Sequence, residues 1–252
     1  MAESNTQFEI PFDVIELPSK GLLYPGADNT CKVQYMTASD ENILTSPNLI
    51  KNGKALDVLL ERKIVDSPIP VKDFLIGDRN AIMIWLRATG YGEMYPVKLV
   101  DPNTGEEFEY EVDLNDLKTK PLTAEPDENG YFDFELPKSK KKIKFKLLTV
   151  NDEATILKRS ETRSKAIKSQ ISNTLTYRLE QQIVSVDGNA DKNYISQFIQ
   201  YMPAYDSLKF REYCDEIEPG IDMTLDVEGP SGETFPSIIP IGLDFFWPNA
   251  RV

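Results

Sequence analysis

The sequence contains no histidine in 252 residues and only two cysteines, Cys31 and Cys214. Without histidine, Ser-His-Asp triads, Cys-His pairs and histidine-ligated metal sites are excluded. Two cysteines so far apart indicate neither a disulfide framework nor a zinc site, which is typical of a reducing compartment. The N-terminal sequence MAESNTQFEI lacks the basic residues and apolar stretch of a signal peptide, so we do not expect secretion.

Long apolar runs are also missing, because no stretch approaches the ~20 residues of a membrane-spanning helix. The densest stretches are residues 81–86 and 238–247, and the second is interrupted by Pro240, Gly242 and Asp244. We therefore expect a soluble protein with no membrane span. A chain of this length can bury a sizeable core, in one large domain or two small ones.

Bases are scarce relative to acids, with 28 Lys plus Arg against 41 Asp plus Glu and a net charge of -13. This balance argues against nucleic acid as a partner. The net charge is not spread evenly along the chain: it is -4 in residues 1–95, -9 in residues 96–135 and -8 in residues 187–252. In residues 136–186 the net charge is +8. The layout predicts two oppositely charged surfaces that meet within the chain or between subunits. A nucleic-acid patch made from the basic block is the alternative.

The hydrophobic pattern predicts an α+β protein built from three segments. Residues 1–95 begin as an extended arm and continue with helix signals, such as Pro47 at a helix start, so they predict a mostly helical N-terminal module. Residues 96–148 alternate apolar and polar side chains and predict a β-hairpin region. Residues 149–252 predict one long helix, a pair of short helices and a C-terminal hairpin.

The β-hairpin region contains a strand with a basic face. One hairpin is predicted around the turn at 101–106, and a second pairs residues 131–136 with 142–147. In the last strand Lys142, Lys144 and Lys146 share the face opposite to the apolar residues. We expect this lysine face to meet the acidic face of the first hairpin, which consists of Glu107, Glu109, Glu111 and Asp113.

The long helix is predicted from a capping-box pattern at Thr149–Asp152 and from apolar residues that recur every four positions as far as Ile183. It would end near Val186 and measure on the order of 50 Å at ~1.5 Å per residue. Such a helix is either a buried spine or a projection that engages another subunit. Two shorter helices are expected at 195–202 and 207–217.

A short repeat links the two halves of the chain. Residues 100–108 and 227–235 share the pattern Val, acid, two residues, Thr or Ser, Gly, Glu, any residue, Phe. Glycine after a small polar residue is ordinary turn chemistry, so the repeat predicts two similar hairpin tips.

Several short segments carry a resemblance that extends over nearly the whole chain. In order they are Leu17-Pro-Ser-Lys-Gly21, Tyr35-Met-Thr37, Ile43-Leu-Thr-Ser-Pro-Asn-Leu-Ile50, Leu75-Ile-Gly-Asp-Arg-Asn-Ala81, Gly90-Tyr-Gly92, Leu147-Leu-Thr149, Asp187-Gly188 and Phe245-Phe-Trp-Pro248. Together they resemble the baseplate hub proteins of T-even-type contractile-tailed bacteriophages.

Members of that family often carry Cys-x-x-Cys pairs at the two hairpin tips, as in zinc ribbons. Here these positions hold Asp101 with Thr104 in the first tip and Glu228 with Ser231 in the second. The departure removes the metal ligands, so we expect no metal and no cofactor. We expect the turn glycines to hold the hairpins without a metal.

The resemblance implies a structural, protein-binding subunit of the baseplate hub that takes part in baseplate and tail assembly. It would reside in the virion tail baseplate after assembly in the host cytoplasm, with other hub proteins and the tape-measure protein as partners. A homo-oligomer is left open. The alternative is a transient assembly chaperone for hub or tape-measure proteins that is absent from the mature virion. No Gly-rich phosphate loop or nucleophile elbow is present, so we do not expect an enzyme.

Two groups of residues are candidates for the partner interface. The basic strand contributes Lys140, Lys142, Lys144 and Lys146, whose charge predicts salt-sensitive docking. The C-terminal segment contributes Phe245, Phe246 and Trp247, because aromatic residues anchor interfaces disproportionately. The alternative for the aromatic residues is that they close the protein's own core.

Overall fold

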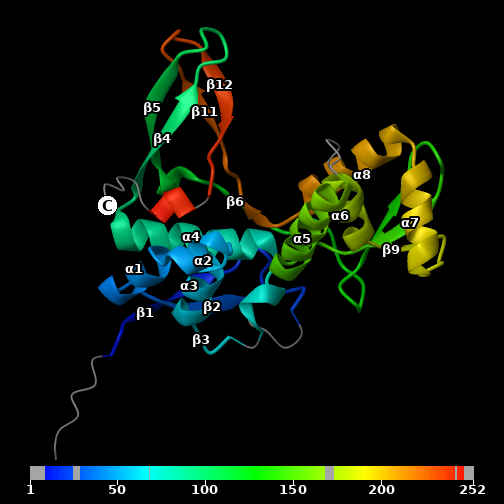
Figure 1. The fold of residues 1–252 in the computed structure, drawn as a ribbon, viewed down its shortest axis with the longest axis horizontal. Helices are drawn as coiled ribbons and strands as arrows, with labels where there is room; N and C mark the ends of the chain where they lie inside the picture. The colour runs from blue at the N-terminus through cyan, green and yellow to red at the C-terminus, as the bar shows by residue number, and fades with distance from the viewer. Residues whose placement is uncertain (1–8, 25–28, 68, 168–172, 242, 247–252) are drawn as a thin grey trace, which may run out of the picture.

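The computed structural model describes residues 9–24, 29–67, 69–167, 173–241 and 243–246. Helices and small antiparallel sheets occur along the whole described chain, which confirms the predicted α+β class. Figure 1 shows a helical layer over a small sheet, an arm of two hairpins that rises from this layer, and a second group of helices and strands beside it. We call these regions the N-terminal module (residues 9–93), the hairpin arm (94–113 with 224–238) and the C-terminal module (131–217).

The N-terminal module combines a three-stranded sheet of order β1-β2-β3 with four helices. Local signals set the helix starts: the N–H of Thr37 donates to Asp40 Oδ2 at 2.8 Å in a capping box, and Pro47 stands where no backbone donor is needed. The elements are β1 (Phe12–Glu16), β2 (Thr30–Gln34), α1 (Ala38–Leu44), α2 (Pro47–Lys51), α3 (Ala55–Lys63), β3 (Ile64–Val65), the 3-10 turn η1 (Val71–Asp73) and α4 (Ile76–Tyr91).

Helix α4 lies beneath the hairpin arm and forms the centre of the core, where Ile82 and Leu86 are fully buried (Figure 1). Its first turn touches β10 (Gly220–Ile221), which pairs with β6 (Thr119–Lys120). The approach is so close that a Cβ atom at Gly77 would collide with the carbonyl oxygen of Pro219. Glycine at this position therefore permits direct contact between two backbones that are distant in sequence.

The hairpin arm consists of two antiparallel hairpins that each bury one face. Leu99 and Val112 are buried in the first and Val227 in the second, while the rings of Phe108 and Phe235 meet edge to face at 6.3 Å. The predicted pair of similar hairpin tips is thus confirmed, and the two tips lie together. The strands are β4 (Met94–Val100), β5 (Glu107–Asp113), β11 (Thr224–Glu228) and β12 (Thr234–Ile238), and the 3-10 turn η2 (Leu114–Asp116) follows β5.

The C-terminal module contains a sheet of order β7-β8-β9 and four helices. Its core is aromatic: the ring of Phe145 packs edge to face on Phe210 at 4.9 Å and lies 5.5 Å from Phe132. The elements are β7 (Phe132–Glu135), β8 (Lys142–Phe145), α5 (Val150–Ile167), α6 (Thr174–Gln182), β9 (Ile183–Val186), α7 (Lys192–Tyr201) and α8 (Ala204–Ile217). The two short helices expected after the long one are confirmed as α7 and α8.

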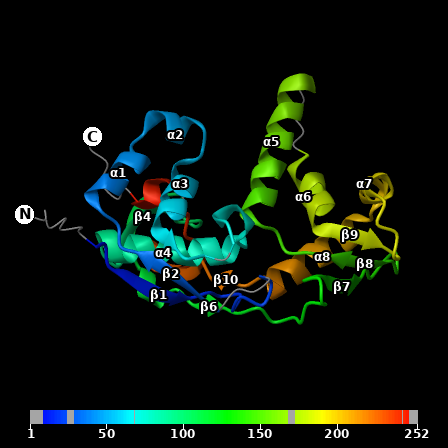
Figure 2. The same cartoon turned by 90° about the horizontal axis from the view of Figure 1, so that it is seen from below.

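The prediction of one long helix from 149 to about 186 is wrong. Helices α5 and α6 pack side by side (Figure 2), and residues 183–186 form β9 instead. Asn173 precedes α6 as its N-cap residue. Asparagine disfavours a helix interior, because its side chain competes with the backbone for hydrogen bonds. Ion pairs of 2.8 Å between Arg159 and Glu180 and of 2.7 Å between Arg178 and Glu153 join the two helices. Neither the buried spine nor the single projecting helix describes this arrangement.

The three segments predicted from the sequence interlock in space. Strand β9 belongs to the third segment but completes the sheet formed by β7 and β8 of the second. Hairpin β11-β12 likewise joins β4-β5 in one arm. These contacts cross the predicted boundary at residue 148. The division at residues 95 and 148 stays a prediction.

Candidate functional site

The lysine strand β8 binds acids of its own module. Lys144 faces Asp133 across the β7-β8 ladder, and its Nζ lies 2.7 Å from Asp127 Oδ2 and 3.4 Å from Asp133 Oδ2. The hydrogen bond from Lys144 holds the pKa of Asp127 below its usual value, and the same bond raises the pKa of Lys144. Lys144 is thus occupied within the chain.

The other three candidate lysines differ in their surroundings. Lys146 Nζ lies 2.7 Å from Asp152 Oδ2, which also accepts from the backbone of Thr149 at the start of α5. Lys140, in the turn before β8, and Lys142, opposite Glu135, are exposed. Neither of these two forms an ion pair with another described residue.

The predicted partner of the lysine face is wrong. Strand β5, which carries Glu107, Glu109, Glu111 and Asp113, pairs with β4 in a separate two-stranded sheet. The alternation of apolar and polar residues correctly indicated which lysines share a face of the strand. It does not indicate which strand lies beside them, because strand pairing depends on the tertiary fold. The acids that meet Lys144 come from β7 and from the turn that contains Asp127, and the acid that meets Lys146 is Asp152 of α5. All of them are closer in sequence than the acids of β5.

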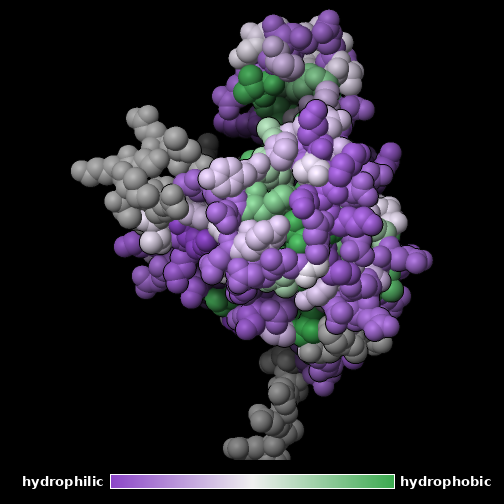
Figure 3. All heavy atoms as spheres, turned by 90° about the vertical axis from the view of Figure 1, so that its right-hand side faces the viewer, coloured by the Kyte–Doolittle hydropathy of each residue, from purple (hydrophilic) through white to green (hydrophobic). Residues whose placement is uncertain are grey.

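Lys146 also lines an open cavity of about 700 Å³ in the C-terminal module. Helices α5, α6 and α7, strand β9 and Tyr131 supply its walls. The lining includes apolar side chains, among them Val184, Ala190 and Ile195. Figure 3 views the side of the molecule that bears this module, where hydrophilic residues dominate and small hydrophobic patches lie between them.

The cavity is basic because three cations and one acid line it. Glu180 has both carboxylate oxygens engaged, one by Arg159 at 2.8 Å and the other by the hydroxyl of Ser196 at 2.7 Å. Arg159 also stacks 4.2 Å above the ring of Tyr177. Lys192 is exposed and has no ion pair within the described chain. The arrangement suits an acidic protein segment that also presents an apolar side chain.

The predicted interface role of Phe245 and Phe246 is not what the structure shows, because both are fully buried in the protein's own core. They lie in the 3-10 turn η3 (Leu243–Phe246), and Arg87 of α4 donates from Nε to the carbonyl oxygen of Phe245 at 2.8 Å. The ring of Phe245 packs edge to face on Tyr95 at 4.8 Å. The core-closing alternative therefore describes these two residues, and Trp247 lies outside the described part.

The tip of the hairpin arm is held by a carboxylate. Asp101 is fully buried and accepts from the N–H groups of Asn103 at 2.8 Å and of Ser231 at 3.0 Å. Hydrogen bonds, above all from Ser231, hold the pKa of Asp101 below its usual value. Gly229 leaves room for this carboxylate, because a Cβ there would lie 2.5 Å from Asp101 Oδ2. The carboxylate of the first tip and the backbone of the second are thus joined directly.

A second buried acid, Asp78, joins two of the sequence segments that carry the family resemblance, residues 17–21 and 75–81. Asp78, from Leu75-Ile-Gly-Asp, accepts from the N–H of Ser19 at 2.9 Å and from the hydroxyl of Tyr24 at 2.6 Å. Burial nevertheless raises the pKa of Asp78. The contact fastens the turn after β1 to the start of α4. Sequence reasoning missed it, although an acid within an apolar helix start was a usable signal.

The described chain contains no group of three or more His, Cys, Asp or Glu side chains that could hold a metal ion. Across the same described ranges, every helix is too short or too polar to cross a membrane.

Comparison with known proteins gives one match. No curated protein and no solved structure matches the chain. The sequence model of the family described as "T4 bacteriophage base plate protein" matches residues 12–234, which include nearly all of the N-terminal module, most of the hairpin arm and the whole C-terminal module. Because this match covers most of the sequence, the resemblance to phage baseplate proteins is confirmed, and the chain belongs to the T4 bacteriophage base plate protein family.

Proposed function

We propose that this baseplate protein is a structural, protein-binding subunit of the hub that docks with other hub proteins and with the tape-measure protein. Its place would be the virion tail baseplate, after assembly in the host cytoplasm. Its work would consist of forming interfaces between neighbouring subunits, without a cofactor or a catalytic step.

The observation that carries this proposal is the separation of charge between two regions of one molecule. The hairpin arm contains nine acids and one base, whereas the segment from 136 to 186, in the C-terminal module, contains twelve bases and four acids. The arm projects from the body (Figure 1), and the cavity lies in the C-terminal module. Exposed surfaces of opposite sign are suited to docking with neighbours of complementary charge.

The cavity offers little support for catalysis. Glu180 is the one acid among the described residues that line it, and both of its oxygens are engaged. A glycosidase-type reaction needs two carboxylates that flank the substrate. This supports a binding surface as the role of the cavity.

Quantitative mass spectrometry of purified tails tests the proposal. We expect a constant copy number relative to the tube and baseplate proteins, and this number should survive extensive washing of the particles. Absence from particles, together with recovery in hub complexes from infected-cell lysates, would replace the structural subunit with the transient chaperone. A hydrolase activity that remains with the pure protein would contradict the non-enzymatic role.

A further inference from the structure

The free end of the hairpin arm presents an apolar side chain among unpaired acids. Val100, at the end of β4, has 59% of its surface exposed and lies opposite Glu107. Glu106 and Glu228 are exposed at the same end of the arm. None of these three carboxylates forms an ion pair with a base of the described chain. The tip therefore combines an exposed apolar residue with uncompensated negative charge.

The cavity of the C-terminal module has the complementary composition. Lys192 brings positive charge without an ion pair in the described chain, whereas Lys146 and Arg159 are paired with Asp152 and Glu180. Val184 and Ala190 provide apolar lining. Its volume of about 700 Å³ falls in the ~300–1,000 Å³ range of sites that enclose a small ligand.

We propose that copies of this chain associate head to tail, with the acidic arm tip of one copy seated in the basic cavity of the next. The arm and the C-terminal module, which contains the cavity, are separate parts of the molecule (Figure 1), so the contact joins two different surfaces. Interfaces of this kind form a ring when the rotation between copies closes and an open filament when it does not. The occupant of the cavity is therefore a second copy of the chain.

This inference goes beyond the proposed hub role, because it concerns the purified chain alone. A failure would leave the copy number in virions unaffected, so the two ideas are tested separately.

The first measurement is sedimentation velocity of the full chain over a concentration series. At ~0.05 M salt we expect the average mass to rise with concentration above the 28.6 kDa of one copy, and at ~0.5 M salt to return toward it, because screening shortens the reach of exposed charges. A mass of one copy throughout the series at low salt would overturn the proposal.

A charge exchange identifies the surfaces. The arm variant is Glu107→Lys and the cavity variant is Lys192→Glu; both side chains are exposed and without an ion pair in the described chain. Each variant alone should lose association. An equal mixture should regain part of it, because each altered surface then meets a partner of opposite charge.

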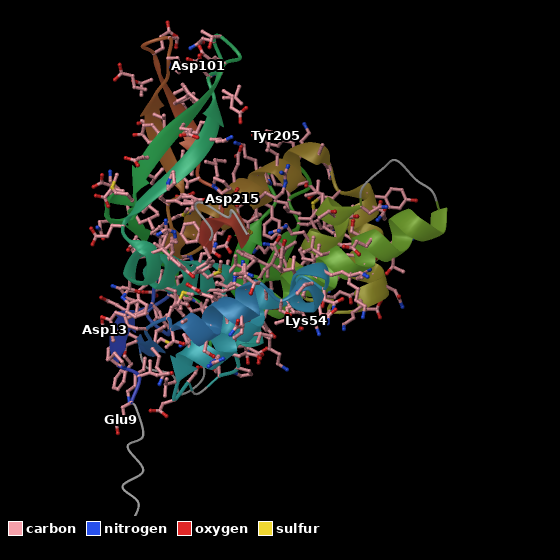
Figure 4. The ribbon with its side chains drawn as sticks, turned by 60° about the vertical axis from the view of Figure 1, so that its left-hand side comes forward. Glu9, Asp13, Lys54, Asp101, Tyr205 and Asp215 are labelled. Atoms are coloured by element: carbon pink, nitrogen blue, oxygen red, sulfur yellow. The ribbon has the colours of Figure 1, made fainter. Side chains whose placement is uncertain are left out.

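The matched control is Lys54→Glu on the N-terminal module, at an exposed position. Figure 4 shows Lys54 away from Asp101 at the arm tip. This variant makes the same change in net charge as the cavity variant and should associate as the unaltered chain does. Equal loss in the control, or no recovery in the mixture of two variants that keep the unaltered circular dichroism, would contradict the arm-to-cavity contact.

Discussion

The Asp101 carboxylate accepts a hydrogen bond from the backbone N–H of Ser231, across 130 residues of sequence. This bond ties the tips of two hairpins that share a sequence pattern. A Cys-x-x-Cys pair at each tip, which this chain lacks, would be able to join the tips through a metal. Here a single carboxylate and the backbone of the opposite turn provide the link.

Asp101→Asn should loosen the arm tip, because an amide is a weaker acceptor than a carboxylate for the N–H groups that converge there. We expect faster hydrogen exchange at residues 101–105 and 229–232, with little change in α4. Hydrogen exchange followed by mass spectrometry measures both regions. Glu106→Gln is the control, since it removes a neighbouring exposed charge and no contact to the second hairpin. Unchanged exchange in Asp101→Asn would contradict the role of the carboxylate.

Stability should depend on pH through Glu218 at the end of α8. Burial raises the pKa of Glu218 to about 7, from 4.5. Between these values the folded chain holds a proton that the unfolded chain has released, so the free energy of unfolding should increase as the pH falls from about 8 to about 5. Chemical denaturation at several pH values measures it.

Glu218→Gln provides the comparison for this pH dependence. The amide does not titrate, so the extra gain in stability between pH 7 and 4.5 should be missing from the variant. Parallel pH curves for the two proteins would show that Glu218 titrates normally in the folded chain.

Arg87 should be essential for the attachment of the C-terminal turn. It is almost fully buried and donates to the carbonyl oxygens of Phe245, Gly92 and Met94. Arg87→Ala should lower the free energy of unfolding by about 2–4 kcal/mol, because three hydrogen bonds from a charged donor are lost and the buried carbonyl oxygen of Phe245 stays unpaired. Urea denaturation measures the loss. Lys98→Ala, at an exposed arm position, should change stability far less.

The lysines of β8 should divide into two classes when their charge is reversed. Lys144→Glu places a carboxylate beside Asp127 and Asp133, so it should lower the melting temperature clearly. Lys142→Glu, at an exposed position without an ion pair in the described chain, should lower it much less. Thermal denaturation of both variants makes the comparison. Equal losses would indicate that both lysines are structural.

Local patterns predicted local structure well. The strands around the turn at 101–106 and the helices near 195 and 207 follow from alternation, turn residues and apolar spacing. Ile183 was misassigned because its spacing from Leu179 fits a helix, while pairing with Phe145 of β8 places it in a sheet. A single sequence does not show whether a residue such as Ile183 will continue a helix or pair with a strand that is distant in the chain.

The candidate site was predicted in part. Lys146 was recognised by its position on a basic face, and it does line the cavity. The other cavity cations, Arg159 and Lys192, come from two helices that only the fold brings together. Burial of Phe245 depends on α4 and Arg87, more than 150 residues earlier in the chain. An aromatic run alone does not distinguish a core from an interface.

The contact between Gly77 and Pro219 affects how the protein can be divided. The backbone of the first turn of α4 rests directly on the segment that leads into β10, and no side chain separates them. A fragment that ends near residue 95 would therefore expose the backbone around Gly77 to solvent. The complementary fragment would lose the packing of residues 219–221 against α4. Limited proteolysis should accordingly leave the two pieces associated after a cut in a connecting loop, and neither piece is a suitable unit for separate expression.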